Sequence, residues 1–169
     1  MSKILTIVRH GKSDWSYDDL ADFDRPLKAR GYTDAYKMAE RLKKEEPLPD
    51  LFYTSPANRA LYTAIIFARV LFNQFDNIDV NEDLYMASYR SILNILRQTP
   101  DKSNHIAIFG HNPGVTDFAN KFIFNQIDNI PTAGYVKLEF DTNCWKDVNP
   151  ENLTNHSFEY PKKSDTNLY

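Results

Sequence analysis

Short, nearly all-apolar runs alternate along most of the chain with longer stretches whose apolar residues recur at helical spacing. The apolar runs have the length and composition of strands that are covered on both faces of a sheet. The pattern predicts strands at 4–8, 51–53, 78–80, 105–109 and 136–140, and helices at 28–45, 57–73, 88–98 and 114–124. Because strands and helices alternate, we expect an α/β fold, a three-layer α/β/α sandwich with a mostly parallel central sheet.

The length of 169 residues suits one ordinary domain with a substantial core. From Asp141 onward the composition becomes polar and rich in Asn, Thr, Lys and Asp. We therefore expect a single domain over residues 1–145 and a polar C-terminal extension over residues 146–169. This extension could form a short hairpin wrapped on the domain, or it could be partly mobile. Its candidate anchors are Trp145, Phe158 and Tyr160.

The charge balance bears on what the chain can bind. The formal net charge is −3, whereas binders of nucleic acid or membrane surfaces usually carry a basic excess, so we expect neither partner. No apolar run approaches the ~20 residues that span a bilayer, and no secretory signal precedes the first strand. The single cysteine, Cys144, excludes an intrachain disulfide and suits a reducing compartment. We expect a cytoplasmic protein.

Three predicted strand ends carry chemically active side chains, in the segments 9–13, 54–59 and 110–114. In an open parallel sheet, ligands bind beyond the carboxyl ends of the strands. The second and third segments also open helices, whose N-terminal N–H groups favour an anion. Together the segments would bring Arg9, His10, Arg59 and His111 to one crevice. The ligand that fits best is a phosphoryl group, because a guanidinium binds its oxygens bidentately.

Each segment taken alone has an ordinary structural explanation. Arg59 would be a solvent-exposed helix residue, and residues 112–114 would form a turn and a helix cap. His10 and His111 could instead ligate a metal, but arginines beside the site oppose a cation, and no Asp, Glu or Cys lies within either histidine loop. We therefore expect neither a metal nor another cofactor. The joint occurrence of the three segments at strand ends favours the phosphoryl site.

The segments RHG at 9–11, SPANRALYTA at 55–64 and GHNPG at 110–114 resemble the histidine phosphatase superfamily, which includes the phosphoglycerate mutases. The segments RHGKSDW at 9–15, DRPLKARG at 24–31 and PTAG at 131–134 resemble its short bacterial branch, the phosphohistidine phosphatases. The similarity runs from Lys3 to about Trp145. It implies a phosphoglycerate mutase-like fold.

The resemblance also implies a role for the matching residues. His10 matches the nucleophile, whose neutral imidazole attacks phosphorus in line and is transiently phosphorylated. Arg9, Arg59 and His111 match the other phosphate-pocket positions, which hold the phosphoryl oxygens and stabilise charge in the transition state.

Four further residues are candidates for binding the substrate phosphate: Lys12, Ser13, Asn112 and Arg25. Structural roles are equally open for three of them. Asn112 suits a helix N-cap, Ser13 a cap of its own turn, and Arg25 a salt bridge with Asp22 or Asp24.

The chain departs from the larger members of the superfamily in one respect. Those members place an acidic proton donor in the loop between the second and third motifs, which is here 81–88 and has no carboxylate beyond Leu84. Glu82 and Asp83 precede that point, and the sequence leaves open whether either donates a proton. A carboxylic acid matters most when the leaving group is a poor alkoxide. Its absence favours a P–N substrate or an activated ester.

We therefore expect a phosphatase with a covalent phosphohistidine intermediate, acting on phosphohistidine in a phosphoprotein or on a small molecule with a similarly labile phosphate. Inorganic phosphate or sulfate is expected to bind in the pocket. One alternative is a phosphomutase or a general small-molecule phosphate monoesterase, although the short loops 14–27 and 86–104 leave little room to enclose a small substrate. A second alternative is a phosphate-recognition module without turnover.

Overall fold

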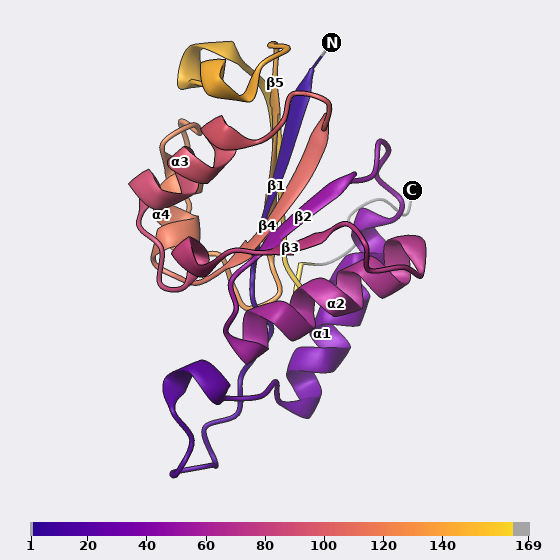
Figure 1. Cartoon of the computed structure of the whole chain (residues 1–169), viewed down its shortest axis with the longest axis vertical. Coiled ribbons are helices and arrows are strands. Elements are labelled where there is room, and N and C mark those ends of the chain that lie inside the picture. Colours follow the sequence, from indigo (N-terminus) through magenta and orange to yellow (C-terminus); the bar gives the residue numbers. More distant parts are fainter. Residues whose placement is uncertain (1, 164–169) are drawn as a thin grey trace.

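Within the described residues, 2–163 of a computed structural model, six strands form one sheet in the order β3-β2-β4-β1-β5-β6 (Figure 1). The strands are β1 (Lys3–Arg9), β2 (Leu51–Thr54), β3 (Ile78–Val80), β4 (His105–Gly110), β5 (Tyr135–Phe140) and β6 (Leu153–Glu159). Strands β1 to β4 run parallel, while β5 is antiparallel to both of its neighbours. The prediction of a mostly parallel sheet is confirmed.

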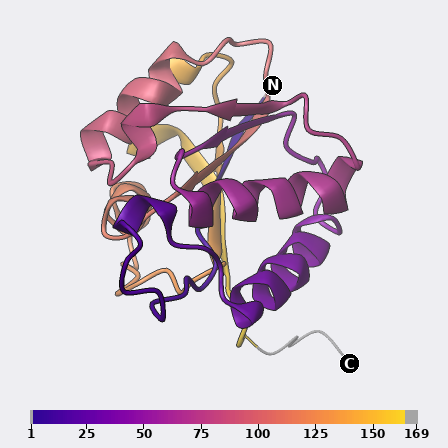
Figure 2. The same cartoon turned by 60° about the horizontal axis from the view of Figure 1, so that its bottom comes forward.

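Helices cover both faces of the sheet (Figures 1 and 2). They are α1 (Ala29–Leu42), α2 (Asn58–Phe72), α3 (Tyr89–Gln98) and α4 (Gly114–Asn120). Successive side chains of a strand point to opposite faces. Along β4, Ile106 and Ile108 accordingly pack with α3 and α4, whereas Ala107 and Phe109 pack with α1 and α2. The predicted three-layer sandwich is confirmed.

The predicted helix and strand ends lie within three residues of the observed ones, with one exception. The helix predicted over 114–124 ends at Asn120. The Asn120 amide donates to the Ile127 carbonyl and accepts from the Ile127 N–H, both at 2.8 Å. Such side chain to backbone bonds compete with helix continuation. The chain therefore turns back after Asn120, and the side chain of Phe124 is left 97% exposed.

The polar segment after Asp141 adds a strand, β6, to the edge of the sheet. Two 3-10 helices, η3 (Trp145–Asp147) and η4 (Pro150–Asn152), lead into β6, which pairs antiparallel with β5 at the sheet edge. Trp145 is fully buried, and its indole N–H donates to the Ser103 carbonyl at 2.8 Å. As far as residue 163, the expected extension is therefore packed on the domain. The rest of it, 164–169, lies outside the described residues.

The sheet brings three carboxyl ends to one end of the molecule, because β2, β4 and β1 are parallel neighbours (lower end in Figure 1). Loop 14–27, which contains the 3-10 helix η1 (Asp22–Asp24), extends from the same end. A hydrogen bond of 2.8 Å from the Lys28 N–H to the Lys12 carbonyl closes the base of this loop. A Cβ at Gly31 would lie 2.2 Å from the Lys12 carbonyl oxygen, so α1 can pack against the segment after β1 only with glycine there.

Candidate active site

The three strand-end segments meet in one pocket of about 400 Å³ at the carboxyl ends of β1, β2 and β4. Loop 14–27 and the turn after η2 (Glu82–Leu84) complete its walls. The residues that line it are Arg9, His10, Lys12, Ser13, Trp15, Asp22, Arg25, Arg59, Tyr85, Met86, His111, Asn112 and Thr132. The structure thus brings all eight of the site residues that the sequence predicts to a single pocket. Their chemical roles stay predictions.

His10 is held as a neutral imidazole with one nitrogen available. The residue is 9% exposed, and its Nδ1 lies 2.7 Å from the Gly11 carbonyl oxygen. Because a carbonyl only accepts, Nδ1 carries the proton and Nε2 keeps its lone pair. Burial, together with His111 and the cations Arg59 and Arg9, lowers the pKa of His10 to about 3, although the bond to Gly11 acts in the opposite direction. At neutral pH the ring can therefore act as a nucleophile.

His111 lies beside His10, with 5.1 Å between the two ring centroids. Its Nε2 is 2.8 Å from the Ser55 hydroxyl, a partner from the second segment that the sequence did not single out. Burial and the nearby Arg59 lower the pKa of His111 to about 4. The serine bond fixes the ring orientation and leaves Nδ1 as the nitrogen that can face a ligand.

Two arginines line the pocket from different elements: Arg9 lies at the end of β1, and Arg59 lies in the first turn of α2. Nη1 of Arg9 donates to the Ile130 carbonyl at 2.8 Å and to the Asn129 side chain at 3.2 Å. Arg59 is 3% exposed and donates to Asp22 through both terminal nitrogens. These bonds set the orientation of both guanidinium groups.

Unpartnered polar atoms concentrate at this site. Within residues 2–163, four buried side-chain N or O atoms have no hydrogen-bond partner: Arg9 Nε, Arg59 Nε, His111 Nδ1 and Asn77 Oδ1. Three of the four belong to the pocket. Because buried polar groups are normally hydrogen-bonded, such a concentration indicates a place built to meet a ligand.

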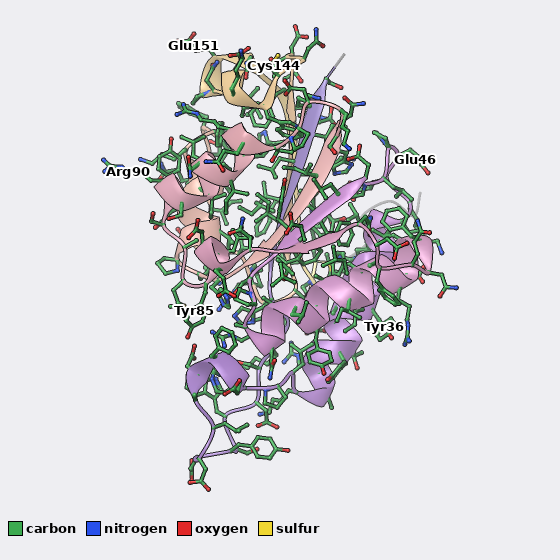
Figure 3. The ribbon with its side chains drawn as sticks, in the orientation of Figure 1. Tyr36, Glu46, Tyr85, Arg90, Cys144 and Glu151 are labelled. Carbon is green, nitrogen blue, oxygen red and sulfur yellow. The ribbon has the colours of Figure 1, made fainter. Side chains whose placement is uncertain are left out.

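Asp22 is the centre of a hydrogen-bond cluster that the sequence did not predict. Its carboxylate accepts from Arg25, Arg59 and the Tyr85 hydroxyl, the last at 2.8 Å. Partial burial raises the pKa of Asp22, but the bonds from Arg25, Tyr85 and Arg59 outweigh it and hold the pKa well below its usual range. Tyr85 lies at the same end of the molecule as loop 14–27 (Figure 3). Of these contacts, the sequence suggested only the pairing of Arg25 with Asp22 or Asp24.

The salt bridge that the sequence offered as an alternative role for Arg25 is present. Arg25 pairs with Asp22, and its Nη1 donates to the Ser13 hydroxyl at 2.7 Å. Its guanidinium also stacks over the ring of Trp15, 3.5 Å from the centroid. Arg25 and Ser13 therefore hold loop 14–27 in place while they line the pocket.

Asn112 and Lys12 lie at the rim of the pocket. The Asn112 amide donates to Asn129 and to the Ile130 carbonyl, and its oxygen accepts from the Thr116 hydroxyl at 2.7 Å. The cap role considered for Asn112 is wrong, because α4 begins without a side-chain cap and this oxygen is already used by Thr116. Lys12 is exposed to solvent.

The two carboxylates considered as proton donors lie outside the pocket. Glu82 and Asp83 are exposed, and neither lines it. Of the described residues that do line it, Asp22 alone carries a carboxylate. Over residues 2–163, no three His, Cys, Asp or Glu side chains form a group that could hold a metal ion. In the same residues, none of the helices has both the length and the apolar character to cross a membrane.

Comparison with known proteins finds a family similar to the N-terminal half of the chain. The model of the histidine phosphatase superfamily, branch 1, matches residues 5–85, which include the first two of the three segments. This match shows similarity to the histidine phosphatase superfamily over just under half of the chain. The third segment lies beyond the matched residues, and the sheet brings it to the pocket.

Solved structures with the same fold include members named for action on phosphohistidine. One is a provisionally named phosphohistidine phosphatase, SixA, of Agrobacterium tumefaciens, with 25% identity, a TM-score of 0.74, and coverage of 82% of this chain and 92% of that chain. Another is the protein histidine phosphatase SixA complexed with tungstate, with 18% identity, a TM-score of 0.73, and coverage of 94% and 97%. At that identity the second likeness shows the fold alone.

Two curated relatives match very different shares of this chain. Phosphoglycerate mutase 1 of Saccharomyces cerevisiae is 41% identical over 64 residues, which cover 37% of this chain and 26% of the mutase. The chain thus spans about a quarter of the length of that relative. An uncharacterised chloroplastic protein of Arabidopsis thaliana is 29% identical over 161 residues, covering 88% of this chain and 71% of that protein.

Proposed function

We propose that this protein is a histidine phosphatase that forms a covalent phosphohistidine on His10 and hydrolyses the P–N bond of phosphohistidine in a phosphoprotein. The supporting observation is the placement of His10, neutral and with Nε2 unprotonated, beside the unpartnered nitrogens of Arg9, Arg59 and His111. The pocket therefore combines a nucleophile with hydrogen-bond donors for the phosphoryl oxygens.

In the first step, Nε2 of His10 attacks phosphorus as the P–N bond of the substrate breaks. The electron pair of that bond leaves with the substrate imidazole, which takes up a proton from solvent and departs neutral. The guanidinium groups of Arg9 and Arg59 hold the phosphoryl oxygens through the transfer, and such stabilisation is typically worth ~10²–10³ in rate per donor. Nδ1 of His10 keeps its proton and donates it in a hydrogen bond to the Gly11 carbonyl oxygen. This bond stabilises the positive charge that develops on the ring.

In the second step, a water oxygen attacks the phosphorus bound to His10. The new P–O bond replaces the P–N bond to Nε2, the water loses a proton to solvent, and inorganic phosphate leaves. His10 returns to its neutral form with the Nδ1 proton still in place. The two steps together consume one water for each phosphohistidine hydrolysed.

The preference for a P–N bond is supported by the lack of a good carboxylic proton donor among the described residues of the pocket. Glu82 and Asp83 are exposed and do not line the pocket. Asp22 does line it, but its arginine partners hold its pKa well below the usual range, which makes it a poor proton donor. A leaving imidazole protonates readily, whereas an alkoxide depends on a general acid, whose help is typically ~10²–10⁴-fold. The pocket therefore suits a labile phosphate.

The proposal is tested by turnover of a phosphohistidine peptide and of p-nitrophenyl phosphate by the unaltered protein, His10→Ala and His156→Ala. His156 is the matched control, because it is an exposed histidine on β6, outside the pocket. We expect hydrolysis of the peptide by the unaltered protein and by His156→Ala, and its loss in His10→Ala. Full activity in His10→Ala would refute the covalent mechanism.

The substrate pair separates the alternative functions. Hydrolysis of p-nitrophenyl phosphate without hydrolysis of the phosphohistidine peptide would favour a general phosphate monoesterase. Failure of the unaltered protein on both substrates, with inorganic phosphate still bound, would favour a recognition module without turnover.

A further inference from the structure

A second pocket of about 430 Å³ adjoins the candidate active site and shares Arg9, Lys12 and Thr132 with it. Its remaining walls come from the N-terminal part of α1, the loop before β5 and the segment after β6. Those residues are Arg30, Asp34, Asn129, Pro131, Tyr160, Pro161 and Lys162. A substrate bound at His10 would therefore extend directly into a second cavity.

The segment after β6 forms one wall of this pocket and is held firmly in place. Arg41 of α1 donates to the Tyr160 carbonyl at 2.9 Å and to the Lys163 carbonyl at 2.8 Å. Lys37, one turn earlier in α1, donates to the Pro161 carbonyl at 2.6 Å. These bonds fix the backbone on both sides of Lys162. The polar extension thus completes a pocket beside the active site.

The charge of the second pocket is strongly positive. Four of its residues are cations, Arg9, Lys12, Arg30 and Lys162, and Asp34 is its single carboxylate among the described residues. Asp34 is already paired with Arg30, at 3.3 Å between Oδ2 and Nε. This concentration of positive charge contrasts with the formal net charge of −3 for the whole chain. The pocket therefore favours an anionic group.

We propose that the second pocket binds an acidic side chain of the substrate polypeptide, close in sequence to the phosphorylated residue. This inference rests on the proposed function, since it assigns a substrate feature to the same site. Lys12 lies between the two pockets and faces both the phosphoryl group and the neighbouring carboxylate. Arg30 and Lys162 contact the carboxylate from α1 and from the extension.

The cations suit a carboxylate on a polypeptide better than a second phosphate on a small molecule. A tight phosphate site presents a desolvated guanidinium that binds two oxygens in a fixed geometry. Here Lys12 and Lys162 are exposed, and the Arg30 side chain is 61% exposed. Flexible ammonium groups recognise charge without fixed geometry, so they tolerate an acidic residue at slightly different positions.

The experiment compares two phosphohistidine peptides that differ only in a flanking residue, Glu in one and Gln in the other. Values of kcat/KM are measured for the unaltered protein, Lys162→Glu, Arg30→Glu and Lys102→Glu. Lys102 is the matched control, because it is an exposed lysine in the loop before β4, outside both pockets. Hydrolysis of p-nitrophenyl phosphate reports on the first pocket alone.

We expect the unaltered protein and Lys102→Glu to prefer the Glu peptide about three- to tenfold, as interactions between partly exposed charges allow. Lys162→Glu and Arg30→Glu should lose or reverse this preference while keeping their activity on the Gln peptide and on p-nitrophenyl phosphate. Equal kcat/KM values for the two peptides in the unaltered protein would overturn the inference but leave the proposed function intact. The pocket would be assigned to small molecules instead if the unaltered protein showed no peptide preference and a small bisphosphate inhibited it more strongly than it inhibited Lys162→Glu. Failure to hydrolyse either peptide would overturn the proposed function itself.

Discussion

The guanidinium of Arg59 donates to the carbonyl of Asp22 at 2.6 Å and to its carboxylate at 2.9 Å. The two residues are 37 positions apart in the sequence, and the bonds join the first turn of α2 to loop 14–27. Arg59 is one of the three residues expected to hold the phosphoryl oxygens, with Arg9 and His111. An anionic substrate therefore meets an arginine that already pairs with a carboxylate of the protein.

Replacing Asp22 with Asn should strengthen phosphate binding. The change removes one negative charge beside Arg25 and Arg59, so that both arginines interact with the incoming anion without competition. Because the Asp22 side chain is 46% exposed, solvent screens much of the effect. We expect the dissociation constant of inorganic phosphate, measured by calorimetry, to fall about two- to fivefold.

The control for this change is Asp24→Asn. Asp24 lies in the same 3-10 helix but does not line the pocket. It should leave phosphate binding unchanged. Weaker phosphate binding in Asp22→Asn than in the unaltered protein would show that Asp22 supports the anion site and does not compete with the anion.

Stability should fall as the pH is lowered from about 6.5 to about 4. Burial lowers the pKa of His10 to about 3 and the pKa of His105 and His111 to about 4. Above pH 6.5 these rings are neutral in both the folded and the unfolded chain, so they contribute no pH dependence. Below it the unfolded chain binds up to three more protons, each worth as much as about 1.4 kcal/mol per pH unit.

The measurement is the free energy of unfolding in denaturant at a series of pH values between 7 and 4. His10→Ala removes one of the three histidines, so its free energy should fall with pH about one third less steeply than that of the unaltered protein. An identical slope in the two proteins would contradict the low pKa assigned to His10.

Replacing Ser55 with Ala should lower kcat more than it changes KM. The Ser55 hydroxyl is the partner of His111 Nε2, and without it the ring loses the bond that fixes its orientation. Donors aimed at the transition state typically contribute ~10²–10³ in kcat, and a misoriented donor should cost about tenfold. Steady-state kinetics on the phosphohistidine peptide check this, and Ser16→Ala in loop 14–27 is the control, because Ser16 does not line the pocket. A rise in KM alone would mean that His111 acts in substrate binding.

Five of the six strands described and the meeting of the three segments could be predicted from the sequence, because both follow from local patterns. Apolar runs such as 4–8 and 105–109 identify buried strands, and parallel strands place their carboxyl ends together. The position of His10 at such an end therefore followed from where the apolar run stops.

The cluster around Asp22 could not be predicted, because it depends on contacts between distant segments. Tyr85 is 63 positions from Asp22, and an irregular polar loop carries no periodicity that would indicate which of its aspartates points inward. The same holds for Ser55 and His111, which are 56 positions apart. Local pattern identifies strands and the loops at their ends, but the hydrogen-bond partners within the loops depend on tertiary packing.

In the proposed mechanism, His10 carries the phosphoryl group during turnover. The most direct test is to quench the reaction with the phosphohistidine peptide in alkali after a few milliseconds and digest the protein. Peptide mass spectrometry then locates any phosphoryl group. We expect one phosphoryl group on Nε2 of His10 in the unaltered protein, removed by acid, and none in His10→Ala. A phosphoryl group on any other residue, or continued turnover with no phosphorylated intermediate, would contradict the mechanism.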